Sequence, residues 1–257
     1  MDKVENPILK PNKIAAVIAY LFMTILGGTI LLMLVSLIYC NIHNLDSSIL
    51  IDILAGSREE YGEYISANAI VSAIANMLNY IITLVLVAFF MRNYLVEDNL
   101  KFKDNKKYLL WYIPLTAIAF FLISFGVDAL VSMSAGSSNN QNLIENMLIN
   151  GGAGYIFIAV VICAPLVEEL IFRKAIFSFL EKKPPIVAHV VSVVLFAVMH
   201  MLSTSFEDPG RWFLLLVPYL VSSILLCLIY EFSKRNVCAS WFAHMLNNLL
   251  AFILMFI

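Results

Sequence analysis

Two adjacent glutamates, Glu168 and Glu169, lie in an otherwise apolar segment, and Arg173 follows one helical turn after the second. On a helix, neighbouring side chains point about 100° apart, whereas residues four apart share a face. The two carboxylates therefore point in different directions. Glu169 can pair with Arg173, which offsets the cost of burying two charges. Glu168 has the apolar Phe172 at the equivalent position, so its carboxylate is free to act as a general base or acid.

Two more apolar segments carry polar side chains that could do chemistry. FAVMH ends in His200 and has Phe196 one turn earlier, and HMLNN begins with His244 and has Asn248 four residues later. At about 1.5 Å per helical residue, these side chains and Glu168 lie about 14–26 Å from the basic residues that flank their segments. We therefore expect one polar cluster built from three helices.

The chain that must position this cluster is too apolar for a water-soluble domain. Hydrophobic residues make up 61% of its 257 residues, charged residues make up 13%, and the mean hydropathy is +0.89. In typical globular domains about a quarter of the residues are charged. A helix of roughly 20 apolar residues crosses the hydrocarbon core, and seven uncharged runs meet this length: 14–45, 64–91, 108–127, 146–167, 184–206, 212–230 and 236–257.

We therefore predict an all-α, polytopic membrane helix bundle that forms a single integral membrane domain over 1–257. The catalytic motifs lie within 154–257, on spans 4 to 7, and 13–132 supplies accessory spans 1 to 3. The successive flanks and loops carry 3, 1, 5, 0, 4, 1 and 2 basic residues, so 14 of the 16 fall on one side. Basic residues accumulate on the cytoplasmic side. The prediction is a cytoplasmic N-terminus and an exoplasmic C-terminus.

Several kinds of site are not expected. The net charge is −2 and no basic run or face is present, so we expect no nucleic-acid partner. The four cysteines show no C-x-x-C spacing, which argues against a disulfide framework or a zinc knuckle. The sequence has no HExxH motif, no GxGD motif and no GxSxG serine on a predicted span, the signatures of other intramembrane proteolytic chemistries.

The three polar segments, taken together, resemble a known family. EELIFR, FAVMH and HMLNN match EExxxR, FxxxH and HxxxN in this order, each on a different predicted span. In this the chain resembles the CPBP intramembrane proteases, which include CAAX-type prenyl-protein endopeptidases and bacteriocin-processing or self-immunity proteins. The resemblance covers 165–248, and spans 1 to 3 match only in being apolar. It implies an intramembrane endopeptidase of a bacterial cell membrane, acting on a membrane-associated peptide or protein.

The resemblance also implies a role for each motif residue. Glu168 would activate water, while Glu169 and Arg173 would support the site. The other catalytic positions fall on His200, His244 and Asn248.

The use of a metal stays open at the level of sequence. Glu168, His200 and His244 could hold Zn²⁺ with an open position for water. Alternatively, Glu168 and His200 polarise water directly while His244 and Asn248 donate hydrogen bonds to the developing oxyanion. We favour the metal-free version because asparagine is a poor zinc ligand but a good hydrogen-bond donor.

Three other functions compete with proteolysis. A non-catalytic bacteriocin self-immunity or binding protein could share the fold, but a lost Glu168 or His200 would be its expected mark. A proton-coupled transporter could use Glu168 and the histidines as a relay, but neither inverted repeats nor paired broken helices are evident. A b-type haem protein could use His200 and His244 as axial ligands, which an absorbance spectrum would show. Prenylated and non-prenylated substrates are equally compatible with these residues.

Overall fold

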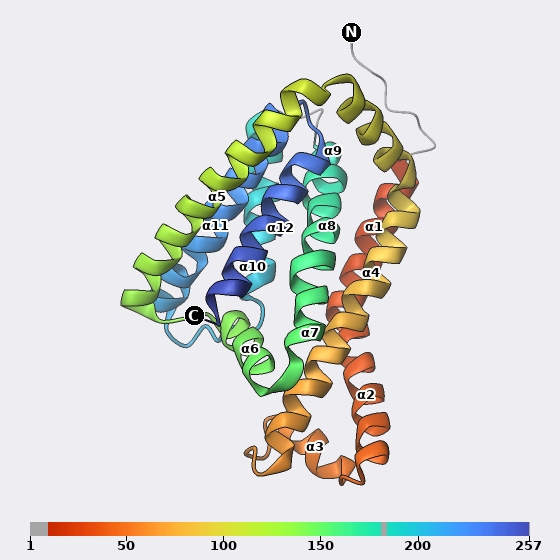
Figure 1. Cartoon of the computed structure of the whole chain (residues 1–257), viewed down its shortest axis with the longest axis vertical. Coiled ribbons are helices and arrows are strands. Elements are labelled where there is room, and N and C mark those ends of the chain that lie inside the picture. The colour runs from red at the N-terminus through yellow and green to blue at the C-terminus, as the bar shows by residue number, and fades with distance from the viewer. Residues whose placement is uncertain (1–9, 181–183, 257) are drawn as a thin grey trace.

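The computed structural model describes residues 10–180 and 184–256, whose regular elements are all helices (Figure 1). Segments labelled η have π-helical winding. The N-terminal elements are α1 (Lys10–Phe22), η1 (Met23–Gly27), α2 (Gly28–His43), α3 (Ser47–Leu54), α4 (Glu63–Asp104) and α5 (Lys106–Ala135). The fourth span consists of α6 (Asn139–Met147), η2 (Leu148–Gly152), α7 (Ala153–Ile156), η3 (Phe157–Cys163), α8 (Ala164–Glu168), η4 (Glu169–Ile176) and α9 (Phe177–Phe179). The last three helices are α10 (Pro185–Met201), α11 (Pro209–Phe232) and α12 (Val237–Leu254).

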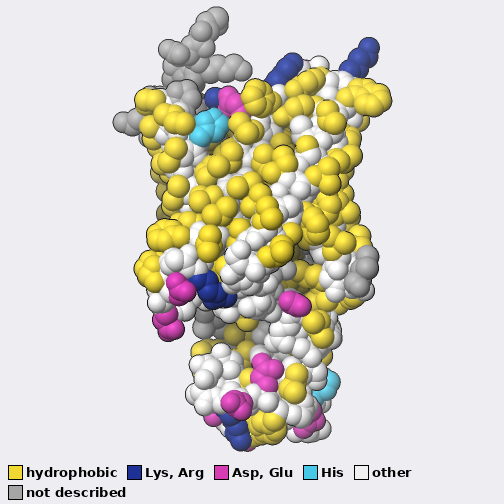
Figure 2. Space-filling view, turned by 90° about the vertical axis from the view of Figure 1, so that its left-hand side faces the viewer, with side chains coloured by type: hydrophobic (Ala, Val, Ile, Leu, Met, Phe, Trp, Pro, Cys, Tyr) yellow, Lys and Arg dark blue, Asp and Glu magenta, His cyan; other side chains and the backbone are white. Residues whose placement is uncertain are grey.

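The helices run side by side in an elongated bundle with two distinct ends. The turn between α4 and α5 lies at the same end as α9, and α3 and α6 lie toward the opposite end (Figure 1). We call these the α9 end and the α3 end. Figure 2 shows a broad band of hydrophobic side chains between the ends, with most of the visible charged side chains above and below it. This distribution fits a bundle whose waist lies in hydrocarbon.

The all-α, polytopic fold predicted from the sequence is confirmed. In the described residues, six helices are long and apolar enough to cross a membrane: Asn12–His43, Glu63–Asp104, Lys106–Ala135, Asn139–Phe179, Pro209–Phe232 and Val237–Leu254. The predicted span over 184–206 corresponds to a shorter apolar helix, Ile186–Met201. Its helix ends early because the following LSTSFED segment is rich in residues that favour turns, and Asp208 then caps α11 by accepting from the Arg211 N–H.

The fourth span is longer than its uncharged run. Helical structure continues past Val167 to Phe179, which carries the whole EELIFR motif into the bundle. The four basic residues counted above for the loop after span 4 include Arg173 and Lys174. These two are only 0% and 5% exposed. Buried cations persist in an apolar bundle only with partners, and both residues have one.

Lys174 is paired with Asp98, a fully buried residue of α4. The second carboxylate oxygen of Asp98 accepts a hydrogen bond from the Val237 N–H at 3.1 Å, at the first residue of α12. Asn236 donates its side-chain amide to the Asp98 carbonyl at 2.8 Å. A carboxylate at a helix N-terminus complements both the free N–H groups and the helix dipole. Asp98 thus ties α4, η4 and the start of α12 together at the α9 end.

The orientation of the bundle in the membrane remains a prediction that fusions can test. A reporter fused after Lys103 is expected to be cytoplasmic, and reporters fused after Asn140 or Asp208 exoplasmic, because the basic residues gather at the α9 end. The side-chain amide of Asn139 donates to the Ser203 carbonyl at 2.9 Å, so α6 and the α10–α11 loop share one end of the fold. Fusions at 140 and 208 on opposite sides would contradict the bundle. An exoplasmic Lys103 would contradict only the orientation.

Candidate active site

The helix that carries the two glutamates has π-helical winding before them, in η3, and again from Glu169 onward, in η4. A π turn is wider than an α turn and occurs often at functional sites. Val160 in η3 accepts a hydrogen bond at its carbonyl from the Asn248 side-chain amide at 3.0 Å. Phe172 in η4 accepts one at its carbonyl from the Ser192 hydroxyl at 2.9 Å. The backbone of this helix is therefore held directly by α12 and by α10.

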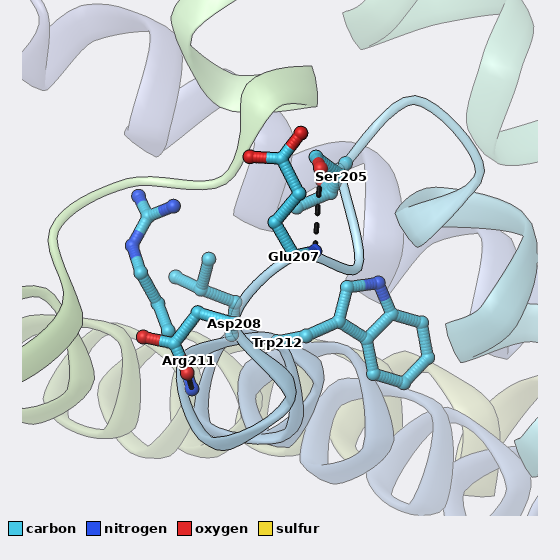
Figure 3. Close-up of a pocket in the computed structure, with 7 residues that line it drawn as sticks. Ser205, Glu207, Asp208, Arg211 and Trp212 are labelled. Atoms are coloured by element: carbon cyan, nitrogen blue, oxygen red, sulfur yellow. Dashed lines mark hydrogen bonds between the residues drawn. The ribbon is translucent and has the colours of Figure 1, made fainter.

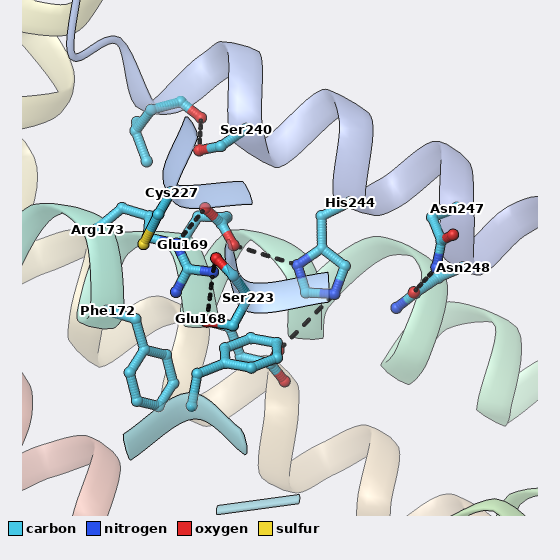
Figure 4. A network of polar contacts seen from close by, with 12 residues as sticks. Glu168, Glu169, Phe172, Arg173, Ser223, Cys227, Ser240, His244, Asn247 and Asn248 are labelled. Carbon is cyan, nitrogen blue, oxygen red and sulfur yellow. Dashed lines mark hydrogen bonds and ion pairs between the residues drawn. The ribbon is translucent and has the colours of Figure 1, made fainter. Parts of the chain in front are cut away.

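Glu169 and Arg173 form the ion pair that their spacing predicted. Arg173 Nε lies 3.5 Å from Glu169 Oε2, and both side chains are 0% exposed (Figure 4). Arg173 also donates through Nη2 to the Ser223 carbonyl at 3.2 Å and to the Ser223 hydroxyl at 3.1 Å. Its guanidinium lies over the Phe196 ring, 5.0 Å from the centroid. The pair sits in the bundle interior and not at an exposed helix end.

Glu169 has a second partner, His244 on α12. The imidazole Nδ1 lies 3.3 Å from Glu169 Oε1, so an ionised Glu169 accepts a hydrogen bond from the Nδ1–H of His244 (Figure 4). His244 Nε2 then faces Glu168, 3.9 Å from its Oε2. Glu169 thereby orients both Arg173 and His244.

His200, near the end of α10, is oriented in a similar way. Its Nδ1 lies 2.9 Å from the Phe196 carbonyl, which can only accept, so Nδ1 carries the proton. Its Nε2 faces Glu168 Oε2 at 3.8 Å. The imidazole lies between the rings of Phe196 and Tyr219, with centroids 4.5 Å and 4.9 Å away. Tyr219 is itself fixed, because its hydroxyl lies 2.7 Å from that of Ser138, the residue that caps α6.

Glu168 is the point on which these groups converge. It is 4% exposed, and one of its carboxylate oxygens faces Nε2 of both His200 and His244. The separations of 3.8 Å and 3.9 Å are too long for direct hydrogen bonds, but a bridging water can span them. The other oxygen, Oε1, lies 3.5 Å from the hydroxyl of Tyr80 on α4. The arrangement can hold and deprotonate a water molecule inside an apolar bundle.

Asn248 does not reach Glu168 in this structure. Figure 4 shows Asn247 and Asn248 farther along α12 than His244 and away from the two glutamates. The side-chain amide of Asn248 donates to Val160, and its Oδ1 accepts from Asn247 at 3.4 Å. The structure thus brings Glu168, His200 and His244 together and leaves Asn248 beside the cluster.

Three residues of the site went unnoticed in the sequence: Tyr80, Tyr219 and Ser223. Single tyrosines and serines are common in membrane helices, so neither type alone indicates a site. A signal was present for Tyr80, because it lies one turn after Asn76 in a predicted span that carries several other polar residues.

The zinc version of the site finds no support in the side-chain positions. Two imidazoles and a carboxylate are zinc donors by type. In the described residues, however, no group of three or more His, Cys, Asp or Glu side chains is arranged so that it could hold a metal ion. Zinc binding stays a prediction, and no catalytic step is assigned to a metal here.

A cavity of about 120 Å³ lies elsewhere, in and beside the loop between α10 and α11 (Figure 3). Arg211 in its wall donates from Nε to the Ala135 carbonyl at 2.9 Å, which ties the end of α5 to the start of α11. None of the cluster residues lines this cavity: its walls are Thr204, Ser205, Glu207, Asp208, Arg211, Trp212 and Leu215.

Comparison with known proteins agrees with the motifs. Residues 150–250 match the family described as type II CAAX prenyl endopeptidase Rce1-like, and this segment includes all three motifs. An uncharacterized protein of Mycoplasma capricolum is 30% identical over 202 residues, which cover 73% of this chain and 55% of the relative. The UPF0177 protein YxdF of Lactococcus lactis is 44% identical over 75 residues, 29% of this chain and 35% of the relative. The chain thus spans about half the length of the first relative and about a third of the second. No solved structure matches the chain.

Proposed function

We propose, from the Rce1-like character of residues 150–250, that this chain is an intramembrane endopeptidase of a bacterial cell membrane. Its substrate is a membrane-associated peptide or protein, of the CAAX type or a peptide precursor. The observation that carries the proposal is the convergence of Glu168 Oε2 with Nε2 of His200 and His244, at 3.8 Å and 3.9 Å, inside a buried bundle.

In the proposed reaction, Glu168 acts first as a general base. A water molecule between Glu168 and His200 gives one proton to Glu168 and donates its other hydrogen to His200 Nε2. The resulting hydroxide attacks the carbonyl carbon of the scissile peptide bond. A new C–O bond forms, the C–N bond breaks, and Glu168 returns the proton to the leaving amine.

The oxyanion of the tetrahedral intermediate needs a hydrogen-bond donor, and His244 is placed to supply it. When His244 carries protons on both nitrogens, Nδ1 donates to Glu169 and Nε2 can donate toward the oxyanion. The carboxylate of Glu169 stabilises the charged imidazole. Asn248 could add a second donor after releasing the Val160 carbonyl, a turn of its side chain that substrate would have to induce.

The function is tested by cleavage with purified protein. We expect cleavage of a membrane-anchored reporter peptide, measured by mass spectrometry. Running a prenylated CAAX peptide beside a non-prenylated precursor identifies the substrate class. Peptide binding without any cleavage would instead favour the non-catalytic self-immunity function.

Metal removal separates the two versions of the chemistry. Protein washed with a strong chelator is expected to keep its cleavage rate, because a glutamate, two histidines and water suffice for the proposed steps. The check is the rate before washing, after washing and after adding back Zn²⁺. A rate that falls on washing and returns with Zn²⁺ would replace the metal-free version and leave the endopeptidase assignment intact.

A further inference from the structure

A row of polar side chains follows one face of α4, although this helix is a membrane span. Spacings of three and four residues place these side chains along one side of the helix. We call them the polar row: Asn68, Ser72, Asn76, Asn79 and Tyr80. Polar groups within the hydrocarbon region must find partners inside the protein or in water.

The polar row begins at the surface of the α3 end and finishes at Glu168. The side-chain amide of Asn68 donates to Glu60 Oε1 at 2.7 Å, and Glu60 is exposed in the loop before α4. Ser72 donates its hydroxyl to Asn68 Oδ1 at 3.3 Å. At the far end of the row, the Tyr80 hydroxyl lies 3.5 Å from Glu168 Oε1.

The middle of the row lacks the partners that its chemistry requires. The amide oxygens of Asn76 and Asn79 are buried, and neither accepts a hydrogen bond from the described residues. A buried amide oxygen without a donor costs free energy. Two such oxygens, one after the other along the row, indicate that an external donor reaches this part of the bundle.

The backbone beside the row is also irregular. The fourth span breaks at Asn150 and Gly151, where Gly151 has a φ of +103°. Gly152 then packs so closely against α4 that a Cβ on it would lie 2.6 Å from the Cβ of Ala73. At membrane depth, non-helical backbone is tolerated where it is buried in protein or lines a water-filled space. This break lies beside the first half of the row.

We propose that the polar row is a path by which water passes from the α3 end of the bundle to Glu168. Hydrolysis consumes one water molecule for each bond, and the site lies in surroundings that otherwise exclude water. The amide oxygens of Asn76 and Asn79 accept hydrogen bonds from water on this path. The Tyr80 hydroxyl forms a hydrogen bond with the water where it reaches Glu168. The use of this water rests on the proposed function, whereas the path itself can be measured without activity.

The path is tested by the reactivity of single cysteines in protein reconstituted in lipid nanodiscs. The native Cys40, Cys163, Cys227 and Cys238 are first replaced by alanine. Ser72→Cys and Asn76→Cys are then treated with a water-soluble thiol reagent. Because only the thiolate reacts and it forms only where water reaches, both are expected to react at least about ten times faster than controls off the path.

Two matched controls come from α4 itself. Ile74 lies at the same depth as Asn76 but on the opposite face, and Val87 lies on the face of the row but beyond Tyr80. Ile74→Cys and Val87→Cys are expected to react slowly. Equal rates at 74 and 76 would overturn the path. A fast reaction at 87 would place the entry of water at the α9 end and overturn the proposed direction.

Cleavage kinetics give a second readout. Asn76→Leu is expected to lower kcat severalfold with little change in KM, and Asn76→Ser, which keeps a polar group, to recover most of the rate. A rise in KM alone would show that the row binds the peptide substrate and would overturn its role in water supply. Fast labelling of the Asn76→Cys variant, in a protein that cleaves no peptide, would uphold the path and refute the protease. Slow labelling of that variant in an active protein would refute the path and uphold the protease.

Discussion

Replacing Glu168 by glutamine is expected to lower the cleavage rate by at least about 100-fold, the usual contribution of a general base. The amide of glutamine has the shape of the carboxyl group but cannot take a proton from water. The melting temperature is expected to stay close to that of wild type. Glu168 makes no ion pair with Arg173, and the new amide can donate toward Nε2 of His200, which lies near Glu168 Oε2.

The measurements are cleavage rates and melting temperatures in detergent. Glu59→Gln is the matched control, since it makes the same chemical change on an exposed residue at the α3 end. It should alter neither quantity. A Glu168→Gln protein that cleaves at the wild-type rate would remove Glu168 from the mechanism.

Replacing Glu169 by glutamine is expected to have the largest effect on stability. Arg173 is 0% exposed and would lose its only carboxylate partner within 4 Å in the described residues. Removing one member of a buried ion pair typically costs about 3–5 kcal/mol. Cleavage should fall as well, because His244 Nδ1 would lose the carboxylate that orients the ring.

The double variant Glu169→Gln with Arg173→Met separates the two effects. Removing both charges is expected to recover part of the lost stability, since an absent pair costs less than a broken one. Cleavage is not expected to recover with it, because His244 still lacks its charged partner. If Glu169→Gln melts at the wild-type temperature, the pair adds nothing to stability despite its burial.

The parts of the site that could be predicted from sequence depend on local helix geometry. The pairing of Glu169 with Arg173 follows from a spacing of four residues, which any helical winding close to regular preserves. The approach of His200 and His244 to Glu168 follows from counting residues from the flanking cations to each polar side chain, because the spans cross a hydrocarbon layer of one thickness. Neither inference needs knowledge of distant side chains.

What could not be predicted depends on partners far away in the chain. The fourth span runs on through Arg173 and Lys174 because both cations find hydrogen-bond acceptors on other helices. Arg173 donates to Ser223, 50 residues away in sequence, and Lys174 donates to Asp98, 76 residues away. Asn248 turns to the Val160 carbonyl, an acceptor that lies in π-helical backbone. Neither the pairing across helices nor the local winding is visible as a pattern of residue types.

Because a π turn holds about one residue more than an α turn, η3 takes up an extra residue with little change in the rotation of Glu168 about its own helix. Loss of one residue there would let the segment rewind as an α-helix and leave the motif facing nearly the same way, whereas loss of one residue from an α-helical turn would rotate the motif by about 100°. Lys174 and Arg173 hold the motif fast to α4 and α11, so the rotation would have to be absorbed toward the α3 end. In this helix a deletion that keeps every motif residue is therefore disruptive where it falls in an α turn and tolerated where it falls in a π turn, so the local winding is itself part of the site's specification.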